Sequence, residues 1–92
     1  MTTTTIPHTI RGESYTFGVE IDGDLPEATI TYPAIDAGGP DLSTVPSDEA
    51  YPVAAIEAAV SAELGRAVRF ARCDAHGAEG DTAYEVWRFR AE

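Results

Sequence analysis

The chain has no lysine and a single cysteine, and these two scarcities limit what kind of protein it can be. One cysteine in 92 residues leaves no internal disulfide, so a hydrophobic core must hold the fold without cross-links. No apolar run reaches the roughly 20 residues that a membrane-spanning helix needs. The segment Met1–His8 lacks the basic and apolar regions of a signal peptide. We therefore expect one soluble, cytoplasmic domain over residues 1–92.

Positive charge is the next scarcity. Sixteen acidic residues face six basic ones, all arginine, and the net charge is −10. All of this net charge lies in residues 1–63, which hold eleven acids and one base, whereas residues 64–92 hold five of each. Such a field opposes direct binding to nucleic acid or to an anionic membrane and attracts a basic protein. The alternative is that the acidity serves solubility alone.

Strict alternation of apolar and polar residues marks the first strands. Residues 14–22 alternate throughout, which predicts a half-buried strand. A shorter strand is expected before it, at residues 5–10, with Pro7 favouring an edge position. Residues 28–32 alternate again after the turn-forming residues 22–26, so we predict an antiparallel hairpin.

A helix is expected over residues 52–64, because apolar side chains recur there at helical spacing and the composition is rich in alanine. The stretch of about 36–50 contains glycine, proline and acidic residues and predicts a long acidic loop. We also expect residues 1–5 to be flexible.

Two further strands are predicted at residues 67–73 and 82–90. Trp87 and Phe89 share one face with Glu85, and Arg69, Arg88 and Arg90 then stand on the outer face. The fold class is therefore α+β: a two-layer sandwich with an antiparallel sheet of four or five strands and one helix on one face, in the order β-(β)-β-α-β-β.

The stretch 72–81 gathers side chains that suggest chemistry, but its position favours a hairpin loop at residues 74–81. Its candidate ligands do not reproduce the spacing of a zinc or calcium site, so we predict neither a metal nor a cofactor. Cys73 and His76 lack an evident third group for nucleophilic catalysis, and His8 is expected at the surface. The candidate ligands are Cys73, Asp74, His76, Glu79 and Asp81.

The acidic residues of the first half are the predicted partner-binding site. Glu20, Asp22 and Asp24 are spaced by two, so on a strand they line one face about 6.7 Å apart and imitate a row of phosphates. The following turn and loop extend this surface. The predicted partner-binding residues are Glu20, Asp22, Asp24, Glu27, Asp36, Asp41, Asp48 and Glu49.

The functional hypothesis is a small acidic interaction module that inhibits or neutralises a basic partner, such as a nucleic-acid-binding enzyme. A phage or mobile-element inhibitor is the concrete version, and an immunity or antitoxin protein is physically equivalent. Anti-CRISPR and DNA-mimic proteins are similar only in small size and acidity. The alternatives are an assembly subunit that forms a homo-oligomer and, least favoured, an enzyme that uses the 73–81 loop.

Overall fold

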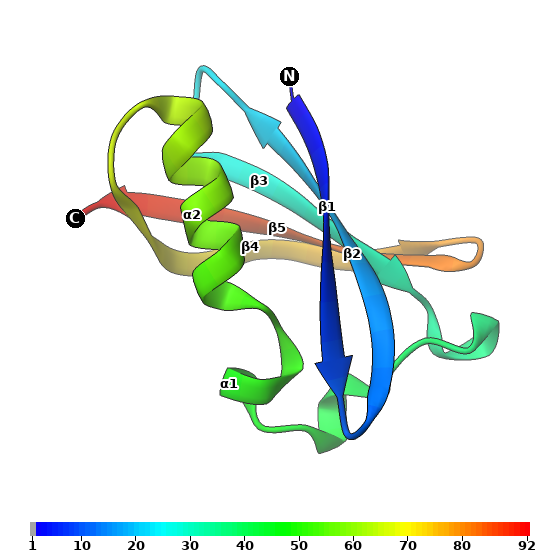
Figure 1. Ribbon diagram of the computed structural model, residues 1–92. Coiled ribbons are helices and arrows are strands. Elements are labelled where there is room, and N and C mark those ends of the chain that lie inside the picture. Colours follow the sequence, from blue (N-terminus) through cyan, green and yellow to red (C-terminus); the bar gives the residue numbers. More distant parts are fainter. Residues whose placement is uncertain (1) are drawn as a thin grey trace.

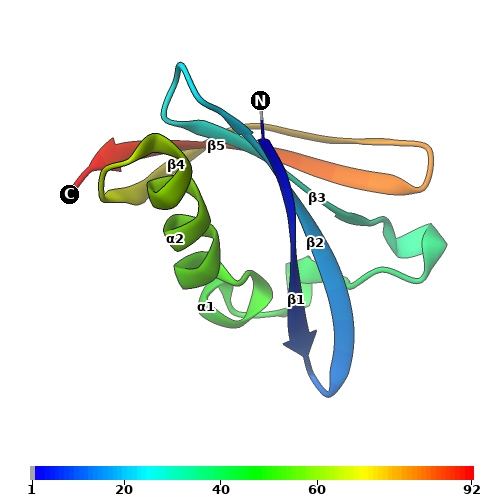
Figure 2. The same cartoon turned by 45° about the horizontal axis from the view of Figure 1, so that its top comes forward.

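Five antiparallel strands form a single sheet in the order β1-β2-β3-β5-β4, and the helices lie on one side of it (Figures 1 and 2). This computed structural model describes residues 2–92, with the side chains of residues 47 and 48 outside the description. The predicted α+β sandwich is confirmed. The elements are β1 (Thr2–Ile10), β2 (Glu13–Asp22), β3 (Glu27–Pro33), the 3₁₀ turns η1 (Ile35–Ala37) and η2 (Leu42–Thr44), α1 (Ser47–Ala50), α2 (Val53–Leu64), β4 (Val68–Glu79) and β5 (Thr82–Ala91).

The β1–β2 hairpin shows how the sequence sets the register. Arg11 and Gly12 both have positive φ, at 50° and 84°, which is the geometry of a tight two-residue turn. Pro7 lies on the sheet edge, as predicted, where its missing N–H costs no ladder hydrogen bond. The strand already begins at Thr2, because Thr2–Thr5 pair with β2, so it includes residues that the sequence assigns to a flexible N-terminus.

The core lies between the sheet and α2. The apolar stripe of the helix packs against the inward side chains of the strands, and Ile56 and Val60 are fully buried there. α2 ends at Gly65, which adopts the left-handed conformation with φ of 71° that favours glycine. Among the described residues, no helix is both long and apolar enough to cross a membrane. The largest fully buried side chains are Phe17, Val19, Ile21, Ile30, Ile56 and Val60.

The segment predicted as a long loop at about 36–50 contains three short helical turns. Asp41 caps η2, because its carboxylate accepts hydrogen bonds from the backbone N–H and the hydroxyl of Ser43. Gly38 ends η1 with φ of 83°. Short polar caps and glycine stops produce these turns without the apolar periodicity that would reveal a helix in the sequence.

The predicted hairpin loop at residues 74–81 is wrong. β4 continues to Glu79, and the connection shrinks to Gly80 and Asp81. Two irregularities interrupt the β4 register, one between Phe70 and Arg72 and the other between Cys73 and Ala75. At each irregularity β4 has one extra residue without a partner on β5, and pairing resumes after it. The strand therefore continues although its sequence does not alternate strictly.

Candidate functional site: an acidic groove and a divided sheet face

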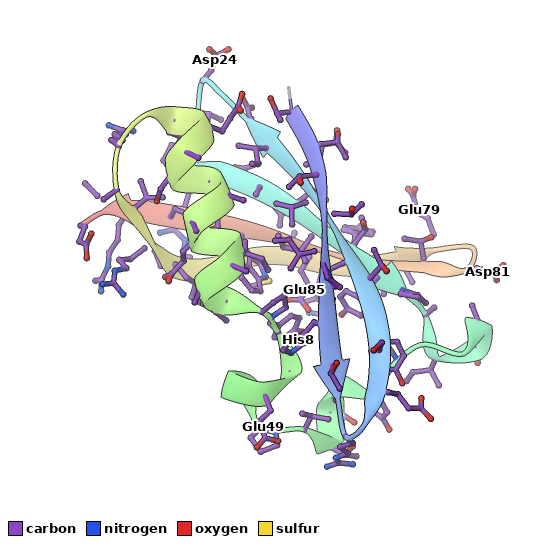
Figure 3. All side chains as sticks on the ribbon, viewed as in Figure 1. His8, Asp24, Glu49, Glu79, Asp81 and Glu85 are labelled. Carbon is purple, nitrogen blue, oxygen red and sulfur yellow. The ribbon has the colours of Figure 1, made fainter. Side chains whose placement is uncertain are left out.

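The structure separates the predicted partner-binding residues into two groups at opposite ends of the molecule. Figure 3 shows Asp24 at the top and Glu49 at the bottom. Glu27 begins β3 and Pro33 ends it, so the chain moves about 20 Å along the strand before it reaches Asp36. The predicted residues whose side chains the structure describes therefore do not form one continuous surface.

The first group lies at the β2–β3 end of the sheet. Glu20 and Asp22 share the outer face of β2, since they pair with Thr29 and Glu27 on β3. β2 ends at Asp22, so Asp24 lies in the turn, where its backbone N–H donates to the Asp22 carboxylate over 2.9 Å. The expected row of three carboxylates along a strand is thus a row of two. Glu27 forms an ion pair with Arg88 at 3.1 Å.

The second group lies in the segment between β3 and α2. The side chains of Asp36 and Asp41 belong to the η1 and η2 region, and Glu49 belongs to α1. The backbone carbonyl of Glu49 lies 2.7 Å from Nε2 of His8, which is half-buried with its ring against Phe17 rather than free at the surface. The predicted residue Asp48 has a side chain outside the described part of the structure.

A groove of about 530 Å³ lies beside the second group. One wall is the η1–η2 segment, and the floor includes Tyr32 from β3 and the facing pair Ala78 and Ala83 from the β4–β5 hairpin. Most of the lining is apolar, and Ile35 is 62% exposed. The lining residues are Tyr32, Ala34, Ile35, Asp36, Pro40, Asp41, Leu42, Ser43, Ala78 and Ala83.

Carboxylates stand around this groove. Asp36 and Asp41 line it directly, and the backbone carbonyl of Asp81 accepts a hydrogen bond of 2.8 Å from Ala34 N–H, which joins the hairpin tip to the groove wall. Glu79 ends β4 beside that tip, but it pairs with Thr82 and lies on the face of the sheet opposite the groove floor (Figure 3). None of the carboxylates of Asp36, Asp41 and Asp81 forms an ion pair with another described residue. The sequence suggested Glu79 and Asp81 only as candidate metal ligands and did not reveal the contact of Asp81 with the groove wall.

Glu85 is the centre of a second cluster, on the core face of the sheet. Its carboxylate accepts hydrogen bonds from the hydroxyls of Tyr32, at 3.0 Å, and Tyr51, and from the indole N–H of Trp87, at 3.1 Å. Burial, together with the Glu85 charge, raises the pKa of Tyr32 to about 12. Burial and the Glu85 hydrogen bond also raise the pKa of Tyr51. In the sequence, the alternation of residues 82–90 places Glu85 on the same face as Trp87, and this was the feature from which the cluster could have been predicted.

Cys73 also faces the core side, which corrects its predicted position beside Arg69. The irregularity after Phe70 shifts the register so that Cys73 pairs with Trp87 and His76 pairs with Glu85. The Cys73 sulfur lies 3.6 Å from the Glu85 carboxylate. Burial and that negative charge raise the pKa of the Cys73 thiol, which is the reverse of what a cysteine nucleophile needs.

The arginines gather on the opposite, outer face of β4 and β5. Arg69 pairs with Arg90 and Arg72 pairs with Arg88, so like charges face each other across the hairpin. The Asp74 carboxylate accepts hydrogen bonds from the guanidinium groups of Arg72, at 2.6 Å, and Arg88, at 3.2 Å. These hydrogen bonds and the two positive charges lower the pKa of the Asp74 carboxyl group. The predicted outward position of Arg69, Arg88 and Arg90 is confirmed.

Comparison with family models, with curated proteins and with solved structures finds no match. Among the described residues, no three histidine, cysteine, aspartate or glutamate side chains gather in an arrangement that could hold a metal ion. The function of the protein must therefore be inferred from its own groove, charges and sheet faces.

Proposed function

We propose that this protein is an interaction module that binds a basic partner protein through the acidic groove and thereby blocks the partner's nucleic-acid site. The observation that carries the proposal is the pair of carboxylates without ion-pair partners that line an apolar groove, Asp36 and Asp41, with Asp81 at the hairpin tip joined to the groove wall. Carboxylates free of neighbouring cations attract arginine and lysine side chains and speed association with a basic surface.

The chemistry of the groove defines the partner segment. An apolar side chain fits against Ile35, Leu42 and Ala83, and flanking arginines or lysines reach the carboxylates. Arg11 lines a neighbouring pocket with Asp41, but its guanidinium donates to Thr44 and forms no ion pair with Asp41. A segment with this pattern is common in proteins that bind nucleic acid, where basic residues contact phosphates. The bound acidic protein would then repel the nucleic acid.

The alternative acidic surface, at Glu20 and Asp22, has a different electrostatic setting. Asp22 lies in the same cross-strand row as Glu27, Arg88 and Arg72, so guanidinium groups offset its field. The spacing of Glu20 and Asp22 still matches a phosphate-like row, but this end presents both charges. The groove end therefore fits a basic partner better.

Two variants with equal change in charge test the site. We expect wild-type protein to bind a peptide of arginines around a central leucine, with amide NMR shifts concentrated in residues 34–43 and 78–83. The variant D36K/D81K should weaken binding about tenfold or more, since it replaces attraction by repulsion, whereas E20K/D22K should change it far less. Binding should also weaken as salt is raised.

The inhibitory step needs its own measurement. Labelled DNA bound to a basic nuclease should be displaced by the wild-type protein and by E20K/D22K, but not by D36K/D81K, as followed by fluorescence anisotropy. If both variants lost the ability to displace DNA equally, net charge alone would explain the effect, and the groove would be overturned as the binding site. Binding that ignores both salt and the substitutions would overturn the acidic-module proposal itself.

A further inference from the structure

The sheet face opposite α2 is not covered by any described element (Figures 1 and 2). Strand register assigns its centre to Thr29 and Thr31 on β3 and to Tyr84 and Val86 on β5, all of which are half-buried. A shallow depression passes over these residues from Glu20 to Glu79. A face of this width, with a partly apolar centre, resembles the inner face of a sheet sandwich.

Two glycines keep this face flat. A Cβ atom at Gly18 would lie 2.4 Å from the Thr31 hydroxyl, and one at Gly77 would lie 2.9 Å from the Tyr84 hydroxyl. Because glycine has no side chain, the side chains of Thr31 and Tyr84 can extend across the neighbouring strands instead of projecting away from the sheet. A flat face is what close packing against a second sheet requires.

Charge divides the same face into two halves. The β2–β3 half carries the carboxylates of Glu20, Asp22 and Glu27. The β5–β4 half carries four guanidinium groups and two carboxylates that bind some of them, Asp74 with Arg72 and Arg88, and Glu92 with Arg69; its arginines are Arg69, Arg72, Arg88 and Arg90. Like charges directly opposite each other on neighbouring strands destabilise a sheet. Within the described part of the chain, Arg90 forms no ion pair.

We propose that a second copy of this chain packs on this face, around a two-fold axis that runs parallel to the strands between β3 and β5. Rotation about such an axis exchanges the two halves, so the acidic half of each copy meets the arginine half of the other. Asp22 then lies opposite Arg72 of the second copy, and Glu27 lies opposite Arg88. The face is complementary to itself because its charges are divided along the axis.

The size of the face suits a stable dimer. The five strands side by side span about 24 Å across the sheet. Along the strands, four successive cross-strand rows of outward side chains span about 27 Å, so each copy offers a face of about 650 Å². Both copies together would bury about 1,300 Å², within the range of specific protein interfaces. The dimer leaves the acidic groove open, because the groove floor belongs to the other face of the sheet, so this inference does not depend on the proposed function.

Reversing the charges at Asp22 and Arg72 tests the dimer. Sedimentation equilibrium over a concentration series measures the molecular mass in solution and gives the dimer Kd. We expect the wild type to dimerise. D22R and R72D should each raise the dimer Kd about tenfold or more, because the two-fold axis makes the contact between positions 22 and 72 twice, and each variant places like charges in both contacts. An equimolar mixture of D22R and R72D should form a heterodimer with the wild-type Kd, since every contact is complementary again. The double variant D22R/R72D should recover the homodimer for the same reason.

The control is D36R, which changes the net charge as much as D22R but lines the groove whose floor belongs to the other face of the sheet. It should dimerise as the wild type does, and circular dichroism should show that every variant is folded. A wild type that stays monomeric at all concentrations would overturn the proposal. So would single variants that dimerise normally, or a mixture without recovery. Binding of an oligonucleotide or an acidic peptide to the arginines of a persistent monomer would overturn it as well.

Discussion

The hydroxyl of Tyr51 donates a hydrogen bond to the carboxylate of Glu85, and this contact ties the segment before α2 to the middle of β5. Tyr32 on β3 and Trp87 on β5 donate to the same carboxylate. Glu85 therefore joins three parts of the chain that are far apart in sequence. It lies at the end of the aromatic core, where Tyr51 packs edge-on against Trp87 with ring centres 5.3 Å apart.

Removing this carboxylate should destabilise the protein. Glu85→Ala leaves two hydroxyls and an indole N–H without their acceptor, so the free energy of unfolding should fall by about 2 kcal/mol. Glu85→Gln keeps an accepting oxygen and should cost about 1 kcal/mol. Urea denaturation measures both, with Glu79→Ala, at the exposed end of β4, as the control that should change little. Equal stability of Glu85→Ala and the wild type would contradict a structural role for the cluster.

Alkaline pH should weaken the same cluster. The pKa of Tyr32 is about 12 in the folded protein against an ordinary value of 10, so the unfolded chain loses this proton first as pH rises. The stability contributed by protonated Tyr32 is therefore complete below pH 10 and is lost between pH 10 and 12. The raised pKa of Tyr51 acts in the same direction.

Urea denaturation at several alkaline pH values measures this loss, and tyrosinate absorbance follows the titration. The variant Tyr32→Phe/Tyr51→Phe should show a flatter decline in stability, since it removes both titrating groups. A decline as steep as that of the wild type would assign the pH dependence to other residues.

The wall of the acidic groove depends on one glycine. A Cβ atom at Gly39 would lie 1.8 Å from the carbonyl oxygen of Pro33, which is backbone and cannot rotate away. Gly39→Ala should therefore displace the η1 segment and lower the free energy of unfolding by about 3 kcal/mol. Gly23→Ala is the matched control, because a Cβ atom there meets nothing within 4 Å. Equal melting temperatures for the two variants would contradict this close packing.

The alternating sequence was enough to predict most of the fold. Residues 14–22, 28–32 and 82–90 each bury one side, and the period of two fixes which side chains enter the core. The helix over 53–64 follows in the same way from its apolar stripe. These patterns also placed Glu85 beside Trp87, and Arg69, Arg88 and Arg90 on the outer face.

The irregularities of β4 could not be predicted, because the extra residues, Ala71 and Asp74, are small or polar and fit either face of an edge strand. The first extra residue reverses the side chains that follow it, so Cys73 lies on the core face, and the second restores the original alternation from Ala75 onward. The division of the predicted acidic residues into two groups could not be predicted for a similar reason. Glu27 begins β3 and Asp36 follows its other end, and the composition does not reveal the distance between them.

The corrected position of Cys73 leads to a prediction about its reactivity. Burial and the charge of Glu85 raise the thiol pKa above its ordinary value of 9.0, so little thiolate is present at neutral pH. Alkylation by iodoacetamide should accordingly be slow there, and its rate should reach half-maximum only above pH 9.0. Glu85→Gln removes the negative charge beside the sulfur and should shift this midpoint to lower pH, whereas Glu79→Gln should leave it unchanged. Fast alkylation of the wild type at neutral pH would show that the thiol is activated and would return Cys73 and His76 to consideration as a reactive pair.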